Sequence, residues 1–232
     1  MRVESQRQMH NGGWWHPFDH AGPPPLFVKR QKKQYEPSPD FVALLESWRS
    51  NSIDRIHTLA EHLKLGVRAL NELGTVYAKP YQAYAFPMYL PTGRVVGIRL
   101  RNDAGEKWAV KGSHAGLFIP FGHVGLPNGD LFICEGPTDT AAALSLGLYA
   151  IGRHACQGQE DMVGQVIGIL KIKTVYICCD NDTPGLRGAQ KLASTLKCQV
   201  RKFIPPAKDL REFVADGGTR ELLFSIINGV TQ

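Results

Sequence analysis

Cysteine is absent from the first 133 residues of this 232-residue chain, and no Cys-x-x-Cys pair occurs anywhere in it. Structural zinc sites are usually built from cysteine pairs, so no zinc is expected, although His10, His16 and His20 lie near the amino terminus. The five cysteines are odd in number, and several fall in apolar runs that read as buried strands. This pattern indicates reduced thiols and predicts a cytoplasmic protein.

Long apolar runs are also missing. No stretch of about 18 apolar residues would cross a membrane, and the polar segment from Met1 to Trp15 is unlike a signal peptide. We therefore expect no membrane partner. The Gly-x-x-x-x-Gly-Lys-Ser/Thr loop of a fused helicase is absent as well. The formal net charge of +6 favours, though weakly, an anionic partner such as nucleic acid.

The composition divides the chain into three parts. Residues 1–39 combine glycine- and proline-rich stretches with a basic cluster, which predicts an irregular basic segment. Residues 40–122 show helical periodicity and then short alternating runs, which predicts a small mixed α+β subdomain with basic residues. Residues 129–232 alternate strands with helices. Such alternation is typical of the α/β class, with a parallel sheet flanked by helices.

Two apolar runs in the last part end in acids. The first run ends at Glu135 and leads through a Gly-Pro turn into a helix with Asp139 in its first turn. The second run ends at Asp180 and Asp182 and leads into a helix for which Thr183 is the expected cap. The carboxyl ends of parallel strands form the ligand crevice of an open α/β sheet. These acids are therefore expected to meet.

A divalent cation would relieve the repulsion between such carboxylates. Mg²⁺ prefers oxygen ligands, so one or two Mg²⁺ ions are expected here, with Mn²⁺ as a substitute. We expect Glu135, Asp180 and Asp182 to hold the metal, because unpaired acids at the ends of buried strands are costly. Asp139 has two interpretations. It either contributes to the second ion or is a helix N-terminal acid favoured by the helix dipole.

A strand predicted at Val95–Arg101 alternates apolar and basic positions, which places Arg99 and Arg101 on one face. The next predicted strand, Trp108–Lys111, ends in Lys111, and Lys107 directly precedes it. Two interpretations remain open from the pattern alone. These residues form either a basic surface that faces the carboxylates or a solvent-exposed face of an antiparallel sheet.

These motifs resemble the TOPRIM family, which includes primases, topoisomerases and some nucleases. Glu135-Gly-Pro-Thr-Asp139 and Asp180-Asn-Asp182-Thr-Pro-Gly185 are most similar to the primase versions, which have a second acid four residues after the glutamate and a glycine shortly after the aspartate pair. The segment from Gly93 to Arg101 resembles the basic subdomain that precedes TOPRIM in bacterial and phage primases. In those proteins it holds template and nucleotide phosphates.

The resemblance implies a Mg²⁺-dependent nucleotidyltransferase that makes RNA primers on single-stranded DNA from ribonucleoside triphosphates in DNA replication, with a replicative helicase as a further partner. It makes Glu135, Asp180 and Asp182 catalytic and metal-binding, and it adds Asp139 and Asp209 as further metal ligands. Alternatively, Asp209 is only the cap of a helix that begins at Leu210. The residues implied to bind nucleic acid or nucleotide are Arg99, Arg101, Lys107, Lys111 and Lys208.

Two other functions remain open at this stage. A TOPRIM nuclease would use the same metal site to cleave a phosphodiester. A catalytically silent module would only bind nucleic acid.

Overall fold

The computed structural model describes residues 7–8, 14–15, 39–50, 52–121, 129–155 and 157–229. The chain forms two units, Met1–Glu36 and Pro37–Gln232. In the first unit, β1 (Arg7–Gln8) pairs antiparallel with β2 (Trp14–Trp15). The histidines and the basic cluster predicted in this segment lie outside the described residues. Among the residues described, no helix has the length and apolar character needed to span a membrane.

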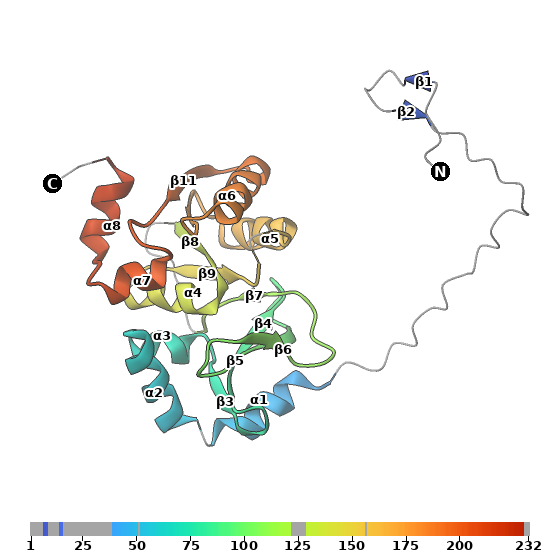
Figure 1. Ribbon diagram of the computed structural model, residues 1–232, viewed down its shortest axis with the longest axis vertical. Coiled ribbons are helices and arrows are strands. Elements are labelled where there is room, and N and C mark those ends of the chain that lie inside the picture. The colour runs from blue at the N-terminus through green and yellow to red at the C-terminus, as the bar shows by residue number, and fades with distance from the viewer. Residues whose placement is uncertain are drawn as a thin grey trace, which may run out of the picture. The chain divides into compact units, whose positions relative to one another are not determined.

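A nine-stranded sheet runs through the described part of the second unit (Figure 1), in the order β11-β10-β8-β9-β7-β4-β5-β6, with β3 paired to β4. One half is parallel and consists of β8 (Asp130–Glu135), β9 (Ala150–Arg153), β10 (Thr174–Cys178) and β11 (Gln199–Phe203). The other half is antiparallel and consists of β3 (Val76–Ala78), β4 (Ala83–Tyr89), β5 (Val95–Arg101), β6 (Lys107–Ala109) and β7 (Leu117–Phe118).

The short strand β7 joins the two halves, because it pairs antiparallel with both β4 and β9. The two segments predicted as separate subdomains therefore contribute to one continuous sheet. The boundary predicted between them, at residues 122–129, lies almost entirely outside the described residues. The division into two subdomains accordingly stays a prediction.

Helices cover both faces of the parallel half, and the alternation of side chains along β8 shows why. Leu131 and Ile133 belong to the core beneath α5 (Glu160–Leu170) and α6 (Thr183–Thr195). Phe132 and Cys134 belong to the core on the other side, with α4 (Gly136–Ser145), α7 (Leu210–Ala215) and α8 (Arg220–Ile227). A strand whose two faces are both buried is apolar at every position. The predicted fold, a parallel α/β sheet flanked by helices, is confirmed.

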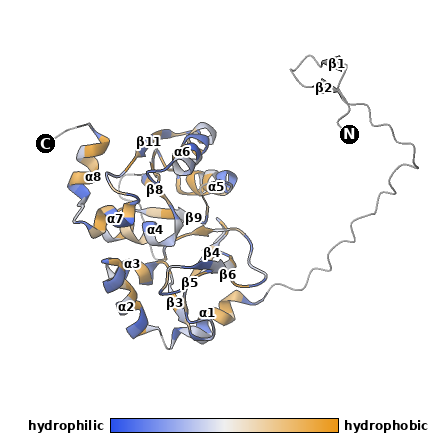
Figure 2. Ribbon diagram, in the orientation of Figure 1, coloured by the Kyte–Doolittle hydropathy of each residue, from blue (hydrophilic) through white to orange (hydrophobic). Residues whose placement is uncertain are grey.

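The antiparallel half has its own helices. The helix α1 (Phe41–Arg49) buries Phe41, Leu45 and Trp48 against a core that contains residues of β4 and β5. The helices α2 (Ile53–Leu63) and α3 (Val67–Glu72) instead share the core of α4. A short 3₁₀ helix (Lys79–Tyr81) connects β3 to β4. Hydrophilic and hydrophobic residues occur on the same helices in Figure 2, as expected where one face is buried.

Two glycines allow α4 to begin directly at the end of β8. Gly136 has φ of +81°, a backbone conformation that residues with a Cβ rarely adopt. Gly152 on β9 lies so close to the start of α4 that an added Cβ would meet the carbonyl oxygen of Gly136 at 2.9 Å. This close approach keeps Glu135 and the first turn of α4 at the edge of the sheet.

The start of α6 differs from the sequence-based prediction. The helix begins at Thr183 and its N-cap is Asp182, whose Oδ1 accepts a hydrogen bond from the Gly185 N–H at 2.7 Å. The prediction that Thr183 is the cap was wrong. Asp182 has an extended backbone, with φ of −137° and ψ of 167°, which brings its carboxylate over the first turn.

Candidate active site

A cavity of about 420 Å³ lies at the carboxyl ends of β8 and β10. Acids from several elements of the parallel half line it, namely Glu135, Asp139, Asp180 and Asp209. Basic side chains also line it, namely Arg99, Arg101, Lys107, Lys208 and Arg211. The cavity thus combines groups that attract cations with groups that attract phosphates.

Glu135 is the last residue of β8, and its carboxylate is mostly buried. Its Oε1 atom has no hydrogen-bond partner among the described residues, and Nη2 of Arg153 lies 3.9 Å from it. Burial, together with the charge of Asp180, raises the pKa of Glu135 to about 7, while Arg153 acts in the opposite direction. An acid with an unsatisfied oxygen that loses its proton near neutral pH is well suited to take up a cation.

Asp180 follows β10 and lines the same cavity. Burial raises its pKa first, and the charges of Asp209 and Asp182 raise it further. Lys107 and Lys208 act in the opposite direction. The carboxylates therefore influence one another electrostatically, as predicted for acids at neighbouring strand ends.

Asp139 is buried, with 8 % of its surface exposed, in the first turn of α4. Its Oδ1 accepts a hydrogen bond of 3.0 Å from the backbone N–H of Arg211 on α7. Burial and, next, the charge of Asp209 raise its pKa to about 7. Asp139 thus connects α4 to α7, a contact that neither sequence-based interpretation included. Its role as a ligand of a second ion stays a prediction.

Asp182 and Asp209 are both helix caps, but only Asp209 lines the cavity. Oδ1 of Asp209 accepts a hydrogen bond of 2.7 Å from the Glu212 N–H, and Oδ2 lies 3.3 Å from Nη2 of Arg211. The capping interpretation of Asp209 is therefore confirmed, and it does not exclude contact with a ligand. Oδ1 of Asp182 is engaged with Gly185. Its charge still acts on Glu135 and Asp180.

The acids fit an oxygen-liganded cation in chemistry but do not form a compact cage. Among the described residues, no group of three or more His, Cys, Asp and Glu side chains is arranged to hold a metal ion. Mg²⁺ usually keeps several waters and uses only one or two carboxylates together with substrate phosphates. Glu135 and Asp180, which face the same cavity, satisfy that requirement. The two would hold the ion.

Four of the five predicted basic residues line the cavity. Arg99 and Arg101 come from β5, Lys107 from β6, and Lys208 from the segment before α7. Burial, followed by the nearby charge of Arg211, lowers the pKa of Arg101. Lys111 is exposed beyond the end of β6 and is not part of the lining. The surface predicted to face the carboxylates is thus present without Lys111.

The sequence pattern predicted that Arg153 and His154 lie in a loop on the same side of the sheet as the acids, but it gave no role to them or to Arg211. Arg153 is instead the last residue of β9. Arg211 and His154 line the cavity, and Arg153 is the buried ion-pair partner of Glu135. The sequence does contain an indication for Arg211, because a residue two positions after the helix cap Asp209 lies in the first turn, close to the cap side chain. A buried arginine at the end of a strand leaves no such signal.

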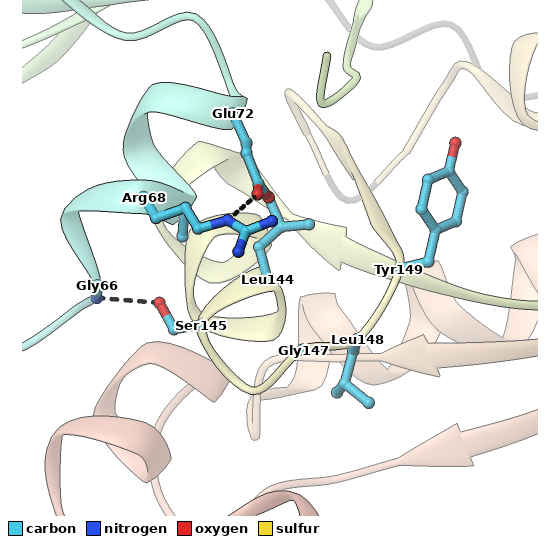
Figure 3. A pocket seen from close by; sticks show the side chains of 9 residues that line it. Gly66, Arg68, Glu72, Leu144, Ser145, Gly147, Leu148 and Tyr149 are labelled. Carbon is cyan, nitrogen blue, oxygen red and sulfur yellow. Dashed lines mark hydrogen bonds and ion pairs between the residues drawn. The ribbon is translucent and has the colours of Figure 1, made fainter. Parts of the chain in front are cut away.

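A second cavity, of about 430 Å³, lies between α3 and the carboxyl-terminal end of α4. Its polar groups pair with each other (Figure 3): Nε of Arg68 lies 2.7 Å from Oε1 of Glu72, and the Gly66 N–H donates to Oγ of Ser145 at 3.1 Å. Among the described residues that line it, Glu72 is the single acid. The similar volume therefore does not make it a second candidate for metal or phosphate chemistry.

Comparison with known proteins finds a family match over the part of the chain that contains the acids of the cavity. Residues 132–214 match the family model described as Toprim-like. The matched segment contains Glu135, Asp180 and Asp209, so it covers most of the parallel half and the acids of the cavity. The match spans about a third of the chain, and within that part the resemblance to TOPRIM is confirmed. A search of curated proteins found no match to the chain.

Solved structures extend the similarity beyond that segment. A DnaG primase catalytic domain bound to ssDNA is similar with a TM-score of 0.63 and 16 % identity, over 81 % of this chain and 76 % of that chain. The primase fragment of the bacteriophage T7 primase-helicase protein gives 0.57 and 17 %, over 70 % of each chain. The E. coli primase catalytic core gives 0.55 and 17 %, over 79 % and 76 %. The chain therefore has the fold of primase catalytic cores.

Proposed function

We propose that this protein is a primase-type nucleotidyltransferase that joins ribonucleotides on a single-stranded DNA template in a Mg²⁺-dependent reaction. The observation that carries the proposal is the cavity that Glu135 and Asp180 share with a group of arginines and lysines. Nucleotide joining requires this combination, because a polyphosphate and a cation must be held in the same place.

The basic residues would hold the phosphates. Arg99 and Arg101 belong to a strand that is paired on both sides, so their positions are fixed by the sheet. An arginine guanidinium can donate two parallel hydrogen bonds to a phosphate. Lys107 is the strand neighbour of Arg101 in the pairing of β5 with β6. These three side chains provide a rigid surface for the triphosphate or the template backbone.

The acids would hold the cation. When bound, Mg²⁺ would lower the pKa of the attacking hydroxyl and neutralise charge on the leaving pyrophosphate. Glu135 and Asp180 would contribute carboxylate oxygens from the ends of adjacent, hydrogen-bonded strands. Burial raises the pKa of both acids, to about 7 for Glu135, so a cation would help to keep Glu135 ionised at neutral pH. Asp209 would contribute charge from the cap of α7.

The extent of the similarity favours nucleotide joining over a nuclease reaction. A Toprim-like segment alone is compatible with both. The similarity to primase cores, however, also covers residues of the antiparallel half, because it extends over 81 % of the chain. That half supplies Arg99, Arg101 and Lys107. A replicative helicase is a proposed partner by analogy with the T7 protein, and the cytoplasm is the proposed location.

Three outcomes, two products and binding without a product, distinguish the proposal from its alternatives. The purified protein is incubated with single-stranded DNA, labelled ribonucleoside triphosphates and Mg²⁺, and the products are separated by size. Labelled oligoribonucleotides that depend on the template support the proposal. Shortened DNA without labelled products would instead identify a nuclease. Retained DNA binding with neither product would identify a silent binding module.

A further inference from the structure

Arg153 is a charged side chain that is fully buried at the end of a strand. Only 1 % of its surface is exposed, and it is the last residue of β9. Charged side chains are rarely buried to this extent unless an opposite charge lies nearby, because removal of a charge from water is costly. A fully buried arginine beside a proposed cation site therefore requires an explanation.

The strand register provides the opposite charge. Glu135 on β8 and Arg153 on β9 are directly paired positions in the parallel ladder, so their side chains project to the same face of the sheet. Nη2 of Arg153 lies 3.9 Å from Oε1 of Glu135. This separation is longer than a hydrogen bond, so the attraction is that of two charges in a poorly solvated environment.

Arg153 approaches Glu135 from the neighbouring strand β9 and not from the cavity. It is absent from the cavity lining, whereas Glu135 is part of it. A cation that binds Glu135 from the cavity therefore meets the field of a guanidinium beside the same carboxylate. The lining already carries more basic than acidic side chains. Each further positive charge near Glu135 then weakens the attraction of the free protein for a cation.

We propose that Arg153 is a positioning residue that holds Glu135 as an internal counter-cation and competes with a divalent cation for that carboxylate. The inference rests on the proposed function, in which Glu135 is a metal ligand. Arg153 holds the Glu135 carboxylate in place while no metal is bound. It also sets the cation affinity of the free protein low, so that substrate phosphates assist in holding the ion.

Cation affinity measures the competition directly. Mn²⁺ binding to the purified full chain without nucleotide is followed by electron paramagnetic resonance of the free ion. Arg153→Met removes the charge and replaces it with a long, unbranched apolar side chain. Kd for Mn²⁺ is therefore expected to fall about tenfold. Arg153→Lys keeps a positive charge and is expected to bind Mn²⁺ with an affinity near that of the parent protein.

Arg55→Met is the matched control. The Arg55 guanidinium also packs against protein, 4.3 Å from the ring centroid of Tyr77, and it pairs with Asp103 at 2.8 Å. It is not part of the cavity lining. This variant is expected to leave Kd for Mn²⁺ unchanged. An equal gain in affinity for both variants would show a general effect of lost positive charge and would overturn the proposal.

A double-mutant cycle tests the pairing without any metal. Thermal unfolding is measured for Glu135→Gln, for Arg153→Met and for the double variant, in the presence of a chelator. Each single variant removes one of the two charges of this buried pair, so Tm is expected to fall by about 5 °C or more. The double variant is expected to lose clearly less than the sum. Additive losses would overturn the role of Arg153.

The two measurements separate this inference from the proposed function. Absence of Mn²⁺ binding in every variant would overturn both the metal assignment and the competition. Intact Mn²⁺ binding that Arg153→Met leaves unchanged or weakens would overturn only the competition by Arg153. If Arg153→Met does not fold, Arg153→Gln replaces it in both measurements, because it also removes the charge and is likewise expected to lower Kd for Mn²⁺. An Arg153→Lys variant with unaltered stability but lost Mn²⁺ binding would contradict the proposal.

Discussion

The backbone N–H of Arg211 donates a hydrogen bond of 3.0 Å to Oδ1 of Asp139, which joins the first residues of α7 to the first turn of α4. The N-cap of the same α7 is Asp209, which lines the cavity, and the side chain of Arg211 pairs with Asp209 at 3.3 Å. A buried acid thus fixes a second acid and a base at the edge of the cavity. Asp139 contributes to the site through position, whether or not it contacts a ligand.

The substitution Asp139→Asn is expected to change the pH dependence of stability. The pKa of Asp139 is about 7 in the folded protein and its ordinary value is 3.8, so the folded state binds more protons between these values. The free energy of unfolding therefore falls as pH rises from about 4 to 7, by an amount on the order of a few kcal/mol. Asparagine keeps the acceptor for Arg211 and removes the charge.

Thermal unfolding in a chelator, measured across this range of pH, tests the prediction. Asp139→Asn is expected to match the parent protein near the lower end of that range and to be more stable near its upper end. Asp139→Ala is the comparison, because it removes both the charge and the hydrogen-bond acceptor. Parallel pH profiles of the parent protein and the Asp139→Asn variant would contradict the assignment of the raised pKa to Asp139.

Two arginines of β5 are expected to contact phosphates, whereas Lys111 is not. Single-stranded DNA binding is measured by fluorescence anisotropy at several salt concentrations. Arg99→Ala and Arg101→Ala should each weaken binding and reduce the slope of log K against log salt by about 0.7 for each lost contact. Lys111→Ala removes the same charge outside the cavity and serves as the control. An equal decrease of the salt slope in all three variants would show that the loss of any positive surface charge has this effect, and would contradict specific phosphate contacts of Arg99 and Arg101.

Asp209→Asn is expected to separate the cap of α7 from any contact with a cation. Asparagine caps helices about as well as aspartate, so Tm should stay within about 2 °C of the parent value. It is a poorer Mg²⁺ ligand, so half-maximal activity should require several-fold more Mg²⁺. Asp40→Asn is the comparison, because Asp40 caps α1 through its side chain and does not line the cavity. An unaltered Mg²⁺ requirement would leave Asp209 only as a cap.

The acids at strand ends could be located from the sequence because two strong patterns coincide there. Apolar runs followed by Gly and Pro define β8 and β10, and parallel strands place their carboxyl ends together. Glu135 and Asp180 follow directly from this. The cap of α6 was assigned to Thr183 instead of Asp182, because both residue types cap well and only the backbone angles decide between them.

Other features depend on contacts that local patterns do not contain. The strand β7 has two residues, too few for a periodicity, yet it joins the two halves of the sheet. Arg153 is buried beside Glu135, which lies on the neighbouring strand, a relationship between positions that are apart in the sequence. Lys111 follows the end of β6, where the alternation that places Arg99 and Arg101 on one face no longer applies.

Replacement of one carboxylate oxygen of Asp180 by an amide NH₂ group tests most directly the claim that this acid holds a cation for nucleotide joining. Asp180→Asn preserves the shape of a side chain that lines the cavity and removes its charge, so the protein is expected to remain folded, with a Tm within a few degrees of the parent value. Template-dependent synthesis of labelled oligoribonucleotides with Mg²⁺ is expected to fall by at least about 100-fold. Synthesis by the Asp180→Asn variant at a rate close to that of the parent protein would contradict the account.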